Sequence, residues 1–175
     1  GWEVACFAGY FDGNGATIYG LYAPSADNSA LFCTVDGGTA IVNLGVKNSY
    51  FTSSANNYQV CVLFGTSSTN SYGAKREGMV WVNNCLIANN YLYNASTQYV
   101  RSAIVGNSQD AITIDNTLIY GNDATYGDGV KMPVVGNRTN AIPVGTTHYD
   151  GFVPMTAKDG DKELYANAIR NTISL

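Results

Sequence analysis

Four aspartates between positions 110 and 128 have the most recognisable chemistry in this chain: Asp110, Asp115, Asp123 and Asp128. Two carboxylates about 5 to 9 Å apart across a glycosidic bond can hydrolyse it, one as general acid and the other as base or nucleophile. Sequence alone does not give that separation. Because Asp115 stands beside Asn116, we expect it to serve a chain corner instead of a reaction.

A second acidic group lies near the C-terminus, where Asp159, Asp161 and Glu163 form a DGDxE pattern. Carboxylate oxygens suit Ca²⁺, so these three are the candidate metal ligands, although a complete calcium loop needs more of them. His148 is the only histidine. No G-x-S-x-G segment supplies a nucleophile beside it, so we expect His148 on the surface or in packing.

Among the 13 tyrosines, Tyr50 and Tyr91 are the candidate binding residues. Tyr50 follows Leu44 by six positions and Tyr91 follows Cys85 by six, so equivalent strands would place both rings in one column. Exposed rings stack against sugars because they combine a flat apolar face with a polar tip. Glycan contact is one hypothesis for this column, and packing at a corner is the other.

The elements that position these residues are repeats. Four segments carry apolar or small residues two positions apart, which is the spacing of one strand face. The first column holds Leu21, Leu44, Cys85 and Thr117, and the second holds Ala23, Val46, Ile87 and Ile119. A third column, three residues before the first, holds Ile18, Ile41, Val82 and Ile114.

Two inward columns separated by three residues cannot lie in one flat strand, because such positions point to opposite faces. The chain must bend between them, and Gly and Asn tolerate the left-handed conformation of a sharp bend. The predicted corner residues are Gly20, Asn43, Asn84 and Asn116. We expect the three asparagines to stack, with their amides hydrogen-bonded to each other or to backbone.

A second ladder runs through Leu31, Leu63, Ile104 and Val134. Leu63 to Ile104 spans 41 residues, as Leu44 to Cys85 does, whereas Leu31 to Leu63 spans 32. Both ladders therefore lengthen once. The polar segment 66–78 contains the extra residues, and we interpret it as an inserted loop.

Short strands between Gly and Asn corners cannot each bury an apolar face, whereas coils stacked about 4.8 Å apart form continuous parallel sheets. We therefore predict one all-β domain over 1–175, a right-handed parallel β-helix (a solenoid) of about five coils. Segment 158–175 is predicted to cap the last coil, either as a short C-terminal helix or as an imperfect final strand.

Residues 11–22 (FDGNGATIYGLY), 30–33 (ALFC) and 40–46 (AIVNLGV) resemble the GLUG-type repeats of bacterial surface proteins. Such repeats occur in adhesin-like proteins and in non-catalytic regions of some immunoglobulin A-specific metallopeptidases. The resemblance covers 11–65 and fades beyond. Cys33 stands where the repeat usually has Gly, and the metallopeptidase HExxH motif is absent. The resemblance implies a secreted or cell-surface scaffold or binding region, with no catalytic residue to carry over.

Composition excludes several kinds of partner. The chain is 46% hydrophobic and 13% charged, with a net charge of −4. Nine dispersed basic residues do not form the clusters that nucleic acid or an anionic membrane surface requires. No apolar run reaches the roughly 18 residues of a membrane span, and no signal-peptide pattern is present. Because the pattern is already under way at Gly1, we expect a piece of a longer surface protein with flanking domains.

The four cysteines are Cys6, Cys33, Cys61 and Cys85, without a CxxC pair, so zinc binding has no support. We interpret them as small apolar core residues, with disulfides as the alternative. Cys33 and Cys61 lie four strand positions apart in the second ladder, or about 13 Å. A disulfide needs Cα atoms within about 7 Å, so we predict no 33–61 bond.

Two classes of function follow. The leading hypothesis is a non-enzymatic extracellular scaffold or adhesin-like module that contacts a host or microbial glycan or protein. The alternative is a polysaccharide-degrading β-helix, either a lyase or a glycoside hydrolase. Asp110 precedes Thr117 by seven residues and Asp123 follows it by six, which scatters the acids around a coil. We therefore expect no catalytic residue and no activity.

Overall fold

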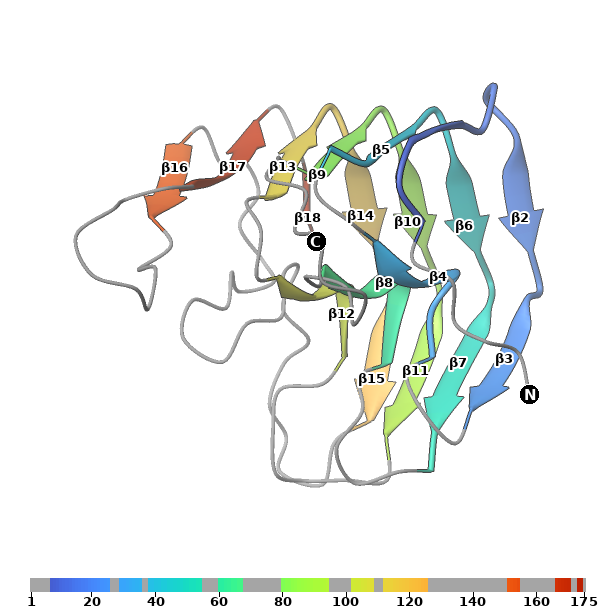
Figure 1. The fold of residues 1–175 in the computed structure, drawn as a ribbon. Coiled ribbons are helices and arrows are strands. Elements are labelled where there is room, and N and C mark those ends of the chain that lie inside the picture. Colours follow the sequence, from blue (N-terminus) through green and yellow to red (C-terminus); the bar gives the residue numbers. More distant parts are fainter. Residues whose placement is uncertain are drawn as a thin grey trace.

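The structure, a computed structural model, describes residues 7–25, 29–35, 38–54, 60–67, 80–94, 102–108, 112–125, 151–154, 166–170 and 173–174. Within these ranges every regular element is a β-strand and none is a helix. The strands lie in four sheets (Figure 1). The predicted all-β class is therefore confirmed for the described residues.

The first two sheets contain the strands that enter and leave the asparagine corners. The first sheet is, in order, β1 (Tyr10–Asp12), β5 (Ala40–Val42), β9 (Val80–Asn83), β13 (Ile112–Asp115), β17 (Ala166–Arg170) and β16 (Gly151–Pro154). The second sheet is β18 (Ile173–Ser174), β14 (Leu118–Tyr120), β10 (Leu86–Ala88), β6 (Gly45–Lys47) and β2 (Thr17–Tyr19).

The other two sheets have fewer strands. The third sheet is β15 (Asp123–Thr125), β11 (Tyr91–Asn94), β7 (Tyr50–Ser53) and β3 (Tyr22–Ser25). The fourth sheet is β12 (Ser102–Ser108), β8 (Val60–Ser67) and β4 (Phe32–Val35).

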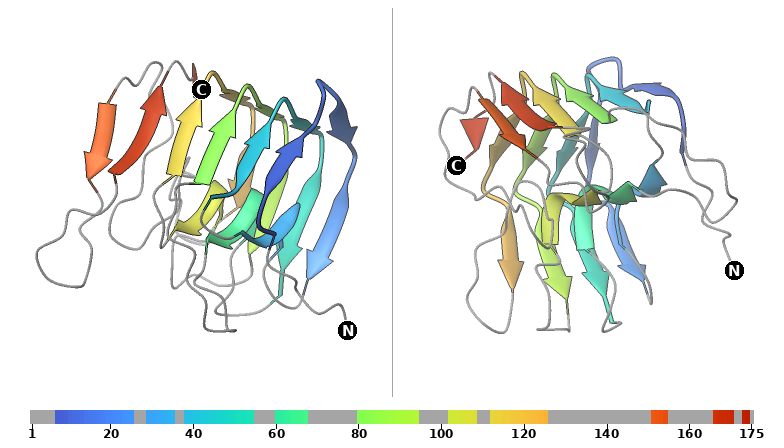
Figure 2. Two further views of the ribbon diagram at one scale, coloured as in Figure 1. Left: turned by 45° about the horizontal axis from the view of Figure 1, so that its top comes forward. Right: turned by 60° about the vertical axis from the view of Figure 1, so that its left-hand side comes forward.

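The chain passes through the sheets in a fixed order, and we call each passage a round. β1 to β4 form the first round, β5 to β8 the second, β9 to β12 the third, and β13 to β15 the described part of the fourth. Equivalent strands of successive rounds pair in parallel and lie side by side (Figures 1 and 2). The exception is β16, which pairs antiparallel with β17.

The predicted columns are confirmed in the second, third and fourth rounds. Ile41, Val82 and Ile114 are in register in the first sheet. Val46, Ile87 and Ile119 are in register in the second sheet. The corner between these sheets contains Asn43, Asn84 and Asn116, with φ of 54°, 52° and 48°. Asparagine is one of the few residues that adopt this left-handed conformation readily, which explains its recurrence here.

The predicted alignment of the first round is wrong. Ile18 pairs with Val46, five residues beyond the Ile41 that the spacing suggested. The cause is a longer corner: Asp12 pairs with Val42 and Thr17 with Gly45, so residues 13–16 occupy the space that residues 43–44 occupy one round later. The partner of Ile41 is therefore Phe11, and Leu21 is not equivalent to Leu44.

A second left-handed corner, between the second and third sheets, was not predicted. Its residues are Gly20, Asn48, Asn89 and Gly121, with φ of 65°, 51°, 54° and 63°. Gly20, which the sequence analysis assigned to the first corner, belongs here because Tyr19 pairs with Lys47. Each described round thus turns twice through a residue of positive φ before it enters the third sheet.

The fourth sheet confirms the second ladder as far as it is described. Phe32 pairs with Phe64, which aligns Leu31 with Leu63. Ala103 pairs with Cys61 and Val105 with Phe64, so Ile104 alone lies opposite two residues of β8, a β-bulge. Val134 lies outside the described residues.

The two special segments are partly described. In the predicted loop 66–78, the first two residues still belong to β8, and 68–78 lie outside the described residues. The first-sheet register nevertheless lengthens in this round: Ile41 to Val82 is 41 residues, and Val82 to Ile114 is 32. In segment 158–175, the described residues form β17 and β18, so the strand alternative applies there and the helix alternative does not.

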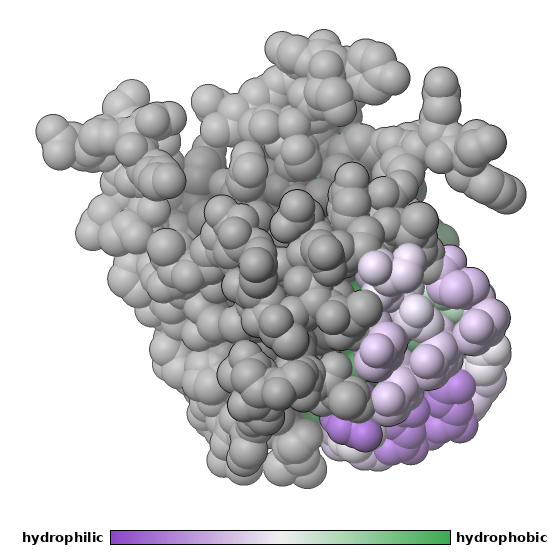
Figure 3. Space-filling model, turned by 90° about the horizontal axis from the view of Figure 1, so that it is seen from below, coloured by the Kyte–Doolittle hydropathy of each residue, from purple (hydrophilic) through white to green (hydrophobic). Residues whose placement is uncertain are grey.

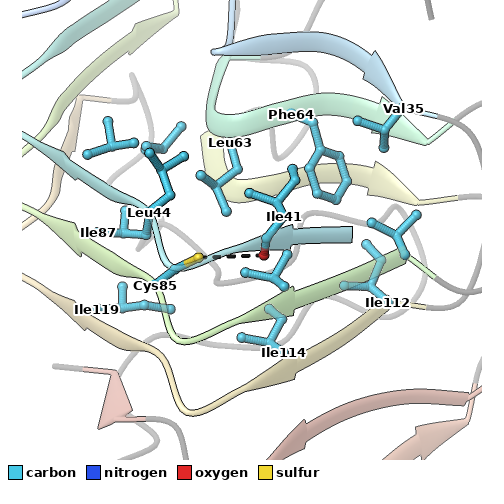
Figure 4. Close-up of a cluster of buried hydrophobic side chains, with 14 of the residues drawn as sticks. Val35, Ile41, Leu44, Leu63, Phe64, Cys85, Ile87, Ile112, Ile114 and Ile119 are labelled. Atoms are coloured by element: carbon cyan, nitrogen blue, oxygen red, sulfur yellow. Dashed lines mark hydrogen bonds between the residues drawn. The ribbon is translucent and has the colours of Figure 1, made fainter. Parts of the chain in front are cut away.

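The core lies between the sheets. The columns of Ile41, Leu44, Ile87 and Ile114 meet side chains of the fourth sheet, including Leu63 and Phe64 (Figure 4). All are at most 4% exposed. Complete burial of an aliphatic or aromatic side chain stabilises the fold by about 1.5 to 3 kcal/mol.

β8 is buried on both faces, because all five residues from 60 to 64 are 0% exposed. An alternating strand with one solvent face would expose every second residue. The fourth sheet lies at mid-height, with the first sheet on one side and the third sheet on the other (Figures 1 and 2). Apolar side chains are therefore required on both faces of this strand.

Candidate functional site

The third sheet places a row of tyrosine rings on the outside of the molecule. Phe51 and Leu92 are 0% exposed and face the core. Successive side chains of a strand point to opposite faces, so Tyr50 and Tyr91 point outward. The predicted common column is confirmed, because Tyr50 pairs with Tyr91.

The row has a third member, Tyr22, which pairs with Tyr50. The rings of Tyr22 and Tyr50 are stacked with centroids 5.5 Å apart at an angle of 15°, and those of Tyr50 and Tyr91 are stacked at 5.1 Å and 3°. We call these three residues the tyrosine ladder. The separations follow from the distance of about 4.8 Å between neighbouring strands.

Sequence reasoning missed Tyr22 because the first round was aligned five residues out of register. A recoverable signal was present: Gly20, Asn48 and Asn89 each precede a tyrosine by two positions. The left-handed residue is thus the reliable marker of the strand start, since it fixes where the next outward side chain will fall.

A column of buried polar residues holds the second corner beneath the tyrosine ladder. Its members are Ser49, Asn90 and Asn122, and we call it the inner polar column. Ser49 and Asn90 are 2% and 1% exposed. Each member immediately precedes the residue that begins the third-sheet strand of its round, so its hydrogen bonds fix where the tyrosines start.

Asn90 makes three hydrogen bonds in this column. Its Nδ2 donates to Val46 O at 3.0 Å and to Asn122 Oδ1 at 2.9 Å, and its Oδ1 accepts from Ser49 N at 3.0 Å. The pattern continues on both sides: Ser49 Oγ accepts from Leu21 N. Buried polar groups with partners of this kind specify a single register, because any shift would leave them unsatisfied.

The geometry limits what the tyrosine ladder can bind. Each face of the Tyr50 ring has a stacked ring on it, so Tyr50 offers a ligand its edge and hydroxyl but no face. Tyr22 has only one stacked neighbour among the described rings and is 68% exposed. The predicted binding residue Tyr50 is therefore a poor stacking platform, for a reason the sequence could not show.

At the opposite end of the row, the position after Tyr91 is taken by Asp123, which is exposed. The second outward column of this sheet contains Pro24, Thr52 and Tyr93. None of the outward residues described on this face is a cation. The described residues that face the viewer in Figure 3 are coloured mainly white to purple, the hydrophilic half of the scale.

The described aspartates do not form a glycosidase pair. Asp115 is 7% exposed and accepts a hydrogen bond from Trp81 Nε1 at 2.8 Å, while Asp123 is exposed on a different sheet. Asp12 shares the column of Asp115 but lies three strands away, or about 14 Å, beyond the range of either hydrolytic mechanism. Asp110 and Asp128 lie outside the described residues.

Asp115 serves the first corner, as its position beside Asn116 suggested. Its backbone oxygen accepts from Asn84 N at 3.0 Å and from Thr117 Oγ1 at 2.8 Å. Thr117 Oγ1 in turn accepts from Cys85 N at 3.3 Å. The corner of the fourth round is thus joined to the corner of the third.

The other candidate sites fall outside the described residues. Asp159, Asp161 and Glu163 are among them, as is His148. In the ranges that the structure describes, no three His, Cys, Asp or Glu side chains are grouped as metal ligands would be. Those ranges also hold no helix long and apolar enough to cross a membrane.

The stacking predicted at the first corner is confirmed for two of the three asparagines. Asn84 Nδ2 donates to Asn43 Oδ1 at 2.8 Å, and Asn43 Nδ2 donates to Asp12 Oδ1 at 2.9 Å. Asn116 Nδ2 donates to Asn83 Oδ1 at 2.8 Å. These side chains are exposed, unlike those of the inner polar column, so their bonds contribute less.

The hydrogen bond from Asn43, and a second from Asn14 N at 2.8 Å, lower the pKa of the Asp12 carboxyl. A lowered pKa in the folded state means that the carboxylate stabilises the fold above its unfolded pKa. That contribution is lost as the pH falls through the folded value.

Replacing Asn84 by Leu is expected to lower the free energy of unfolding by about 1 to 2 kcal/mol, because leucine resists the left-handed conformation. Asn84→Gly is the matched control, since it removes the same side-chain bond but adopts φ of 52° without strain. Urea denaturation of both variants measures the difference. Equal midpoints would show that backbone conformation does not determine this position.

The described cysteines behave as core residues. Cys85 is a free thiol, 4% exposed, and burial raises its pKa. Cys61 is 0% exposed. The register places Cys33 opposite Gly65, four strand positions from Cys61, as the second ladder predicted.

Alkylation in denaturant without reductant should therefore label both Cys33 and Cys61. The register separates their positions by about 13 Å, too far for a disulfide. Peptide mapping by mass spectrometry gives the labelled sites. A disulfide-linked peptide joining Cys33 to Cys61 would contradict the register of the fourth sheet.

Comparisons with protein-family models, with curated proteins and with solved structures find no match to this chain.

Proposed function

We propose that the chain is a right-handed parallel β-helix whose rounds are its coils. We further propose that it serves as a non-enzymatic, extracellular scaffold or adhesin-like binding module of a bacterial surface protein. Four parallel sheets crossed in the same order by successive rounds are what a β-helix would produce. The resemblance of residues 11–65 to GLUG-type repeats supports the extracellular setting.

The observation that carries the binding role is the tyrosine ladder. Three stacked tyrosines stand on the outward face of a sheet whose inward face is fully buried. Rings that the core does not need are suited to contact with a ligand, because tyrosine adds apolar area while its hydroxyl remains hydrated. A glycan is the ligand class that we assign to this surface.

Retention on insoluble polysaccharides tests the proposal. The chain is incubated with a panel of plant, host and microbial polysaccharides, with and without Ca²⁺, and both bound protein and new reducing ends or unsaturated uronate are measured. We expect retention on at least one polysaccharide and no turnover. Turnover abolished by mutating a pair of carboxylates would establish the polysaccharide-degrading alternative instead.

A further inference from the structure

The end of the tyrosine ladder differs from its middle. β3 is the edge strand of the third sheet, and within the described residues it pairs only with β7. One face of the Tyr22 ring rests on Tyr50, and the opposite face points past the sheet edge. An exposed fraction of 68% with one face covered requires that the other face be open.

The ring is also held in position. Tyr50 lies between Tyr22 and Tyr91, and all three extend from strands in exact register. Below them, Ser49 Oγ accepts from Leu21 N at 3.1 Å, which fixes the residue before Tyr22. A ligand that stacks on Tyr22 would therefore lose little affinity to the ordering of that side chain.

The charge on this face selects the kind of sugar. The face of an aromatic ring carries a negative partial charge, so it attracts the C–H hydrogens of a pyranose and repels a carboxylate. No described outward residue of the sheet is a cation, and Asp123 adds a negative charge to the same column. Uronate or sialic acid chains would find no counter-charge here.

We infer that Tyr22 is the sugar-stacking residue of this chain and that its ligand is a neutral glycan. Tyr50 and Tyr91 are positioning residues that hold the Tyr22 ring and line its column with hydroxyl groups. This inference rests on the proposed binding function and adds the residue and the ligand class.

Calorimetric titration tests the inference with neutral hexasaccharides of β-1,4-linked glucose, β-1,3-linked glucose and mannose as probes, and hexagalacturonate as the acidic probe. We expect at least one neutral probe to bind and the acidic probe to bind at least about tenfold more weakly. Tyr22→Ala should weaken the neutral probe about tenfold, whereas Tyr22→Phe, which keeps the ring, should stay within about twofold.

Tyr19→Ala is the matched control. Tyr19 is 63% exposed but stands on the second sheet, outside the tyrosine ladder, with Lys47 Nζ 5.9 Å from its ring centroid. Its removal should leave affinity unchanged. Tyr50→Ala should weaken binding by less than Tyr22→Ala does, since it removes the support and not the platform. Urea midpoints check folding, and Tyr22→Thr, which suits a strand, replaces Tyr22→Ala if that variant is unfolded.

The outcomes separate the two proposals. Binding that Tyr22→Ala and Tyr22→Thr leave intact, or that Tyr19→Ala abolishes, overturns the assignment of Tyr22 while the binding function stands. Preference for hexagalacturonate overturns the neutral ligand class in the same way. If neither the hexasaccharides nor the polysaccharide panel is bound, the proposed function fails and the inference fails with it.

Discussion

Replacing Asn90 by Leu is expected to lower the free energy of unfolding by about 2 to 6 kcal/mol. The substitution leaves Ser49 N and Val46 O without their partners in the core, at about 1 to 3 kcal/mol for each buried group. Asn90 does not have a positive φ, so leucine meets no backbone strain that would confuse the result. Urea denaturation monitored by circular dichroism gives the change in midpoint.

The control for this prediction is the same substitution at Asn84, in the same round. Asn84 is exposed, whereas Asn90 is 1% exposed. The comparison therefore separates the loss of buried hydrogen bonds from the loss of an amide as such. A midpoint for Asn90→Leu equal to or above that of Asn84→Leu would mean that the inner polar column does not stabilise the second corner.

Replacing Ile87 by Ala is expected to destabilise the fold by about 2 to 5 kcal/mol, through lost burial and the cavity that remains. Ile87 is 0% exposed and lies between Val46 and Ile119 in the central column of the second sheet. Because both neighbours belong to other rounds, the cavity weakens contacts across three rounds at once.

Leu118→Ala is the control for this second prediction. Leu118 adjoins Ile119 on the same strand but points outward and is 39% exposed, so its truncation should destabilise by less than about 1 kcal/mol. Thermal unfolding of both variants measures the difference. Similar melting temperatures would imply that the second sheet has its buried face on the other side.

Residue spacing predicted the columns of the later rounds because their corners are short. Between Ile41 and Val46, as between Val82 and Ile87, two residues join one strand to the next, and identical geometry requires identical spacing. In the first round, residues 13–16 form a longer turn with left-handed Asn14 and Gly15. Spacing alone could not place that turn, because Gly20 also fits a corner.

The site was only partly predictable for the same reason. The common column of Tyr50 and Tyr91 followed from their equal distance from Leu44 and Cys85. The stacking of the rings depends on side-chain direction across strands, which spacing does not contain, and Tyr22 was hidden by the misplaced turn. The buried role of Asn90 was missed because a polar residue next to a corner usually indicates a surface turn.

The unequal length of the rounds has a consequence for recognising relatives of this chain. Phe11 to Ile41 spans 30 residues, Ile41 to Val82 spans 41, and Val82 to Ile114 spans 32, yet all four side chains occupy one column. Connections outside the strands can lengthen at small entropic cost, whereas a one-residue slip within a strand reverses every side chain. A search for a fixed repeat period would therefore score this chain poorly. Its ancestry is better traced by profiles that hold the strands and left-handed corners constant and leave the connections free to vary.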